Sequence, residues 1–364
     1  MLTPPAIPDP RRYADNGASP LAAGAHELAA SAADSLSSPN TLAREISGML
    51  ARGDEKPVRD ALRNAPSAQA CRVLYRALDL ALTPGFPADA DSDNAVPEHG
   101  VHLHLFAIPV LLVVGAPAAR RISGVVPDTG AIRALFEQSG ALGHCRNFGL
   151  SNVLAAPEQI DAIPWTTLHS VAHAQSWAGY AGLDLPPTDI DVEAGRETVH
   201  LRFMSGAALT PTDAPAFAEA AGDIGSWGMP LTKELGRQLT TADVSLLAIP
   251  RVPRSIVRAL QEGWFAVREL GFQLFLSNAL RQARMRIGEP DVTVTACPDQ
   301  TIRIRLTSPF DELLDQTYGW PLSPGDDFEA VATSISTLLE EARVERVVVV
   351  PDVKDVSGVT QSSH

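Results

Sequence analysis

The run Val101–Val114 constrains the fold most strongly, because it is the longest apolar stretch in the chain. Only His102, His104 and Pro109 interrupt it. A strand that is apolar on both faces is typical of a sheet covered by other elements on both sides. The run is also shorter than the roughly 20 residues that a membrane-spanning helix needs. It therefore predicts a buried strand inside a layered fold.

The C-terminal part of the sequence predicts a second group of elements. Apolar and polar residues alternate over 292–297 and again over 301–306, which indicates a hairpin with one solvated face. A helical pattern follows over 328–342, with Asp326 and Glu329 at the spacing of a capping box, and Val347–Val350 is typical of a buried strand. The order strand, strand, helix, strand predicts an α/β fold in which a mixed β-sheet is covered by helices.

The organisation of the whole chain follows from changes in composition. Residues 1–38 are rich in Pro, Ala, Ser and Asp and predict a disordered N-terminal tail, with at most a transient helix near 21–35. Residues 39–87 predict a small helical segment, 88–100 an acidic loop and 101–364 the α/β domain.

The longest predicted helix begins after Ser255 and ends at Ile287. Between Trp264 and Leu280 it is apolar on nearly every side, which is typical of a helix packed against several neighbours. Two glycines within it, Gly263 and Gly271, are candidates for a bend.

Composition excludes several classes of protein. The formal charge of −14 argues against a general binder of nucleic acid or of anionic membranes. The three cysteines are far apart and odd in number, so a disulfide framework is not expected. Only three of the 29 basic residues are lysines, and alanine is abundant, which indicates a bacterial coding bias. The N-terminus lacks the apolar segment of a secretory signal. We expect a soluble, cytoplasmic, acidic bacterial protein.

Four histidines are candidate metal ligands. On a strand, His102 and His104 point to the same face, and on a helix His169 and His173 share one face. The second pair resembles half of the zinc-protease pattern HExxH, but Ser170 stands where the catalytic glutamate would be. Both pairs also fit ordinary packing of a strand end and a helix face, which is the interpretation that the spacing favours.

An acidic segment is the second candidate cation site. Asp189, Asp191 and Glu193 alternate and would share one face of an extended segment, and hard cations such as Mg²⁺ or Ca²⁺ prefer such oxygen ligands. The neighbouring prolines and glycine favour a solvated loop instead. The chain contains no GxGxxG, GxxxxGK[ST] or GxSxG motif, so the sequence indicates no nucleotide cofactor and no nucleophilic serine.

Two further groups of residues are candidate interaction sites. Trp227 and Met229 lie within a Gly- and Pro-containing stretch that predicts a flexible loop, and Trp320 lies in a similar context. Each tryptophan also fits an anchor that folds back onto the core. Arg303 and Arg305 lie on the solvated face of the predicted hairpin and would suit an acidic partner or nucleic acid.

The absence of a recognisable catalytic motif favours a non-enzymatic function. We interpret the chain as an adaptor, scaffold or assembly subunit of a bacterial cytoplasmic system, with a protein partner and without a cofactor. The first alternative is a metal-dependent hydrolase that uses the clustered histidines and binds zinc. The weaker alternative is a nucleic-acid-associated protein that uses the arginine patch. The oligomeric state stays open.

Overall fold

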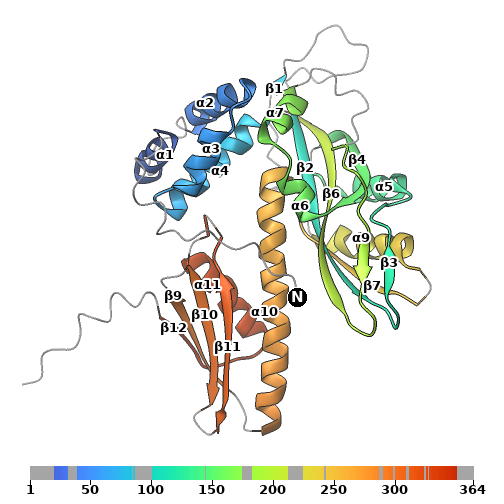
Figure 1. Ribbon diagram of the computed structural model, residues 1–364, viewed down its shortest axis with the longest axis vertical. Coiled ribbons are helices and arrows are strands. Elements are labelled where there is room, and N and C mark those ends of the chain that lie inside the picture. The colour runs from blue at the N-terminus through green and yellow to red at the C-terminus, as the bar shows by residue number, and fades with distance from the viewer. Residues whose placement is uncertain are drawn as a thin grey trace, which may run out of the picture.

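The computed structural model places two larger β-sheets and their covering helices on the two halves of the long helix α10 (Ile256–Arg286), as Figure 1 shows, and the predicted α/β class is confirmed. It describes the following residues: 20–31, 39–83, 85–86, 101–143, 145–173, 183–211, 224–241, 243–286, 290–297, 300–308, 311–323, 325–326 and 328–350. None of the described helices combines the length and apolar character that crossing a bilayer requires.

Four helices form the N-terminal helical segment within the described residues. Its helices are α1 (Pro20–Ser31), α2 (Pro39–Ala51), α3 (Lys56–Arg63) and α4 (Ala68–Ala81). Helix α1 lies inside the predicted tail, yet Leu21, Ala22 and Ala25 are buried. The disordered-tail prediction is therefore wrong for residues 20–31, because these small and apolar side chains pack against the core that α2–α4 form. Residues 1–19, 32–38 and the predicted acidic loop 88–100 lie outside the described residues.

Leu21→Ala should lower the free energy of unfolding by about 2 kcal/mol, because it removes a side chain that is only 2% exposed. The midpoint of urea denaturation measures this change. Glu27→Ala, on the exposed side of the same helix, is the control and should leave the midpoint unchanged. Equal midpoints for the wild type and both variants would show that α1 does not dock.

The central sheet surrounds strand β2 (Val101–Gly115), and the predicted buried strand is confirmed. Strand β2 pairs with β6 (Thr198–Pro211) on one side and with β1 (Gly85–Phe86), β7 (Ser245–Pro250) and β8 (Arg254–Ser255) on the other. Strand β4 (Arg146–Ala155) pairs with the far side of β6. A separate ribbon joins β3 (Arg120–Ile122) to β5 (Ile190–Val192). All four of these pairings of β2 are antiparallel.

Different helices cover the two faces of the central sheet. The N-terminal helical segment, α6 (Pro157–Asp161), α7 (Trp165–His173) and the first half of α10 share one core with it. Helices α5 (Thr129–Ser139) and α9 (Ile224–Leu239) share the other core, which includes Phe106, Ile108 and Val110 of β2. Strand β2 thus contributes side chains to two cores, one on each face of the sheet, which explains why its sequence is apolar on both faces.

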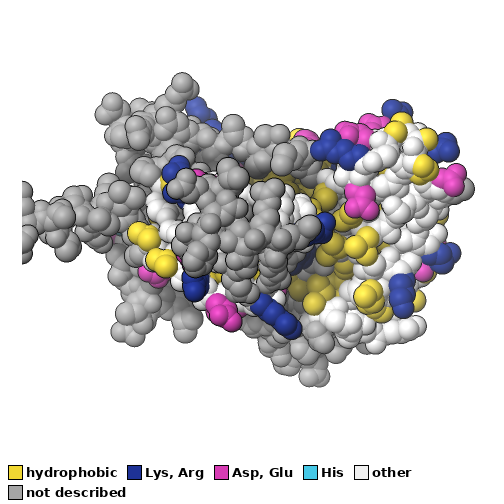
Figure 2. All heavy atoms as spheres, turned by 90° about the horizontal axis from the view of Figure 1, so that it is seen from below, with side chains coloured by type: hydrophobic (Ala, Val, Ile, Leu, Met, Phe, Trp, Pro, Cys, Tyr) yellow, Lys and Arg dark blue, Asp and Glu magenta, His cyan; other side chains and the backbone are white. Residues whose placement is uncertain are grey.

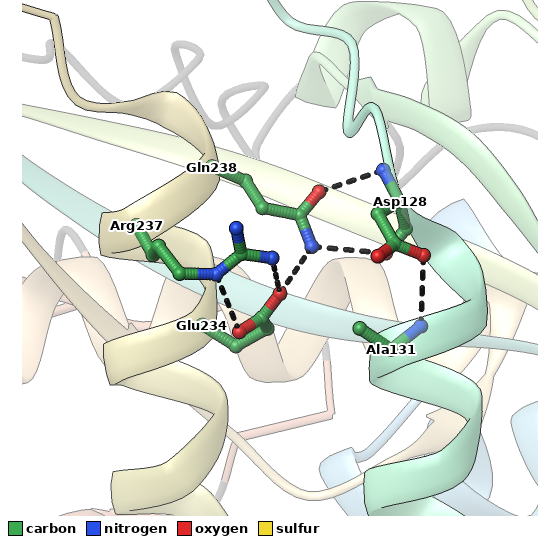
Figure 3. Close-up of polar contacts among 5 residues, drawn as sticks. All are labelled: Asp128, Ala131, Glu234, Arg237 and Gln238. Atoms are coloured by element: carbon green, nitrogen blue, oxygen red, sulfur yellow. Dashed lines mark hydrogen bonds and ion pairs between the residues drawn. The ribbon is translucent and has the colours of Figure 1, made fainter.

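Helices α5 and α9 are joined by a polar contact at one end (Figure 3). Asp128 accepts a hydrogen bond from the Ala131 N–H and caps α5, and Gly140 ends the helix with a left-handed backbone. The side-chain amide of Gln238 bonds to both the N–H and the C=O of Asp128, at 2.8 and 2.9 Å. The same amide donates to Glu234, which also pairs with Arg237. Gln238 therefore holds α9 against the capped start of α5.

Helix α10 is 31 residues long and belongs to two cores. At Gly263 an added Cβ would lie 2.8 Å from Phe203 and 3.0 Å from Leu201, so glycine allows α10 to cross the central sheet closely. A Cβ added at Gly271 would lie 3.0 Å from the Tyr318 hydroxyl. The glycines thus serve close packing, whereas the sequence suggested a bend.

The C-terminal sheet contains, in spatial order, β11 (Asp311–Pro321), β10 (Thr301–Ser308), β9 (Asp291–Cys297) and β12 (Val347–Val350). Helix α11 (Phe328–Glu341) packs on its inner face with the second half of α10. The predicted hairpin is confirmed by the antiparallel register of β9 and β10.

Two predictions for the C-terminal unit are wrong. Strand β12 is the edge of its sheet, so Val348 and Val349 are exposed rather than buried. Asp326 does not cap α11; its carboxylate accepts hydrogen bonds from the Ser323 N–H and from Arg268. Arg268 is almost completely buried on α10, so this ion pair holds the turn before α11 against α10.

Candidate functional site

The histidines proposed as metal ligands make ordinary hydrogen bonds in the structure. His104 Nε2 lies 2.7 Å from the Thr210 hydroxyl on the neighbouring strand. His169 is buried, and its Nε2 lies 2.9 Å from the Ser47 hydroxyl of α2. The His173 ring stacks on His169 at a centroid distance of 3.8 Å, and its Nδ1 bonds to the His169 carbonyl. The side chain of His102 lies outside the described residues.

Among the side chains that the structure describes, no three His, Cys, Asp or Glu residues gather as a metal site. The acidic segment is engaged by arginines: Asp191 lies 3.1 Å and Asp189 3.9 Å from Arg121, and Glu193 lies 3.4 Å from Arg196. Asp189 and Asp191 belong to the region of the β3–β5 ribbon rather than to an irregular loop. The three carboxylates that the sequence suggested as ligands of a metal cation are therefore paired with arginine side chains.

Burial and the neighbouring His173 lower the pKa of His169 to about 4. In the unfolded chain this histidine has its ordinary pKa of 6.5. Neutral His169 thus stabilises the fold fully above pH 6.5, and this contribution is lost as the pH falls towards 4. The difference in urea midpoint between pH 7.5 and pH 5 should be smaller in His169→Gln than in the wild type. His26→Gln, at an exposed position of α1, is the control; equal differences in all three proteins would contradict the assignment.

Trp227 and Met229 have opposite environments. Trp227 is fully buried and meets the Phe136 ring edge-on at 5.8 Å, so of its two predicted roles the structure has the core anchor and not the direct partner contact. Met229 is 62% exposed. The segment that the sequence predicted to be a loop is the start of α9. The spacing of Trp227, Leu231 and Leu235 by four residues was the signal for a buried helix face.

Trp320 and the two arginines of the hairpin are also separated by burial. Trp320 is fully buried against Phe265 and Phe272, so it too is a core residue rather than a partner contact. Arg303 is exposed on the outer face of the C-terminal sheet. Arg305 shares that face and forms a two-point ion pair with Asp315, at 2.6 and 2.7 Å. The basic patch is therefore partly neutralised.

A groove between α10 and α11 is the feature that the sequence analysis missed. It has a volume of about 700 Å³. Its apolar residues are Leu276, Leu280, Leu338 and Ala342, and its polar residues are Gln273, Ser277, Arg281 and Glu341. The leucines are almost entirely buried, whereas the polar residues are exposed. The groove thus has an apolar floor and a polar rim.

A second apolar surface lies at the lower end of the central sheet. Val113 is opposite Val199 on β6 and Leu247 on β7, so the three side chains form a row across three strands on one face. Leu247 is 50% exposed. Figure 2 shows hydrophobic side chains gathered on this unit toward the middle of the molecule, with charged side chains around its outer rim. This surface is a row of side chains across three strands, whereas the groove lies between two helices.

Comparisons with family models, with curated proteins and with solved structures find no match for this chain. The geometry of the described residues is therefore the basis for any functional assignment.

Proposed function

We propose that the protein is a non-enzymatic adaptor or assembly subunit that binds another protein through the groove between α10 and α11. The groove is the observation that carries this proposal, because it joins an apolar floor to an exposed polar rim. Protein-binding sites commonly combine a desolvated apolar centre with a polar periphery. Leu274, 52% exposed and adjacent to the rim on α10, extends the apolar surface.

The leucines of the groove floor already belong to the C-terminal core, in which Phe272, Leu276 and Leu280 of α10 pack against β9–β11 and α11. The apolar surface that a partner would remove from water is therefore mainly that of the exposed Leu274, at about 25 cal/mol per Å². The remaining contacts would be made by the polar rim.

Filling the groove tests this proposal. Ser277 lies in the groove with an exposed side chain, so Ser277→Trp should occupy the site without disturbing the core. Thr333→Trp, on an exposed side of α11 away from the groove, introduces the same ring as a matched control. The wild-type protein and each variant, all untagged, are purified separately from the native cells by size-exclusion chromatography. A stoichiometric partner that is retained by Thr333→Trp and lost by Ser277→Trp supports the proposal.

Other outcomes overturn it. A wild-type chain that elutes alone under all conditions would contradict the adaptor function, and a partner retained by Ser277→Trp would contradict the groove. Metal analysis of the same sample tests the hydrolase alternative. About one zinc per chain, lost on His104→Ala or His169→Ala, would favour the hydrolase over the adaptor.

A further inference from the structure

We infer that β12 pairs with β12 of a second copy of this chain, antiparallel and across a two-fold axis at Val348. This sheet edge is separate from the groove between α10 and α11, so the two surfaces act independently of each other. Three properties of β12 point to this occupant: its outward backbone groups, the exposure of its valines and the match of the strand to its own copy.

The backbone groups on the outer side of β12 are open to a further strand. The Arg346 carbonyl accepts a hydrogen bond from the Val292 N–H at 2.8 Å, and the parallel register with β9 continues to the end of β12. Parallel strands bond through alternate residues, so positions 346, 348 and 350 face β9, and the N–H and C=O groups of Val347 and Val349 point away from it. Within the described part of the chain, no group bonds to this outer side.

Three other sheet edges are covered or charged, whereas β12 is neither. Beside β4, the Leu154 N–H donates to a carbonyl of the segment 124–126, which lies along that edge. At β7, the hydroxyl of Thr232 on α9 donates to the Ala248 carbonyl at 2.7 Å. Strand β11 carries the charged Asp315. Such devices keep further strands away from an edge, and the four valines of β12 supply none of them.

The valines of β12 expose apolar surface on both faces of the sheet. Val348 is 60% exposed on the solvated face, and Val349 is 42% exposed on the face that Val347 shares with the C-terminal core. The neighbouring Arg346 lies 3.4 Å from Asp291 of β9, so its charge is engaged within the chain. A β-branched strand laid along this edge would cover apolar surface on both faces, at about 25 cal/mol per Å².

The four residues match their own copy when the axis passes through Val348. Val347 then lies opposite Val349 of the other copy, and the two residues exchange both of their outward hydrogen bonds. Val348 lies opposite itself, and Arg346 lies opposite Val350, so no like charges face each other. A second β12 therefore uses every outward donor and acceptor of the first.

The short ladder predicts a weak dimer. Pro351 follows β12 directly and has no N–H, so it cannot extend the ladder as a donor. Stable interfaces usually bury about 1,200–2,000 Å² in total, which is more than a pair of such short strands supplies. We therefore expect a dimer that dissociates on dilution.

A disulfide across the axis tests both the pairing and its register. The full chain is used with Cys71, Cys145 and Cys297 replaced by alanine. Val348→Cys should place the facing Cα atoms about 4.5 Å apart, a distance that a disulfide can span. Val350→Cys is the matched control on the same face, because its two copies would lie about 13 Å apart. Mild oxidation should crosslink Val348→Cys at least tenfold more than Val350→Cys.

Sedimentation velocity over a range of protein concentrations tests the association without a new cysteine. Val348→Lys places two cations opposite each other at the axis and should raise the dissociation constant of the dimer at least tenfold. Thr317→Lys, at an exposed position of β11 on the same sheet, changes the charge equally and should leave the constant unchanged. Val348→Thr keeps a β-branched side chain and should retain the dimer.

Several outcomes would overturn the inference. A wild-type chain that sediments as a monomer at every concentration would exclude self-pairing. Equal crosslinking of Val348→Cys and Val350→Cys would show contact without this register. Removal of residues 351–364 tests the rival occupant within the chain: a dimer that the shortened chain keeps supports self-pairing, whereas a dimer that appears only after removal would show that this segment occupies the edge.

Discussion

Phe272→Ala is expected to lower the free energy of unfolding by about 3–5 kcal/mol. Phe272 is fully buried on α10 and meets the rings of Tyr318 and Trp320 at centroid distances of 5.4 and 6.1 Å. Truncation leaves a cavity at the point where α10 joins the C-terminal sheet, and both tryptophan and tyrosine lose a partner. Urea denaturation followed by tryptophan fluorescence measures the change.

Phe275→Ala is the matched control, because Phe275 lies one turn along α10 and is only partly buried against the same core. It should cost clearly less than Phe272→Ala. Equal costs would mean that the two side chains are equally enclosed. A near wild-type midpoint for Phe272→Ala would contradict the packing of α10 on the C-terminal sheet.

The elements that the sequence predicted correctly are those whose signals are local. The sequence itself carries both end signals of helix α5, because Asp128 is a typical N-cap residue and caps the helix, and Gly140 ends it with a φ of 65° that suits glycine. The β9–β10 hairpin shows strict alternation, and Ile302 and Ile304 face the core as predicted. In both cases a few neighbouring residues carry the whole signal.

Strands β4 and β11 were missed because distant residues determine them. Strand β4 contains Asn147 with a φ of 49° and two irregularities in its register with β6, so alternation is broken. Strand β11 begins with Asp311 and carries Asp315, residues that ordinarily disfavour strands. Pairing with β10 and the Arg305–Asp315 ion pair override that local preference.

The candidate site could not be predicted either, for a related reason. Its two walls, near Leu276 and Leu338, are separated by three strands in sequence and meet only when α10 and α11 pack on the same face of the C-terminal sheet. The histidine pair at positions 169 and 173 had a clear spacing, but Ser47, which bonds to His169, comes from a remote helix. Spacing indicates which side chains share a face, whereas the partner of that face is a property of the fold.

Trp227→Ala is expected to lower the free energy of unfolding by about 3–5 kcal/mol, the second of the two largest effects. The ring is enclosed in the core between the central sheet and α9, in contact with Phe136 of α5. Loss of the ring would loosen the packing of α9 against α5. The hydrogen bonds between Gln238 and Asp128 are a separate contact between the same two helices. Thermal and urea denaturation both measure this change.

Met229→Ala separates a core role from an interaction role within the same turn of α9. Met229 is 62% exposed, so its truncation should leave the urea midpoint unchanged, within about 0.5 kcal/mol. If partner recovery falls in Met229→Ala at unchanged stability, α9 contributes to binding in addition to the groove. If Trp227→Ala reduces partner recovery at unchanged stability, the tryptophan acts at a surface and the packing of α9 on the central sheet is wrong. The two residues are two positions apart, and burial predicts opposite results for them.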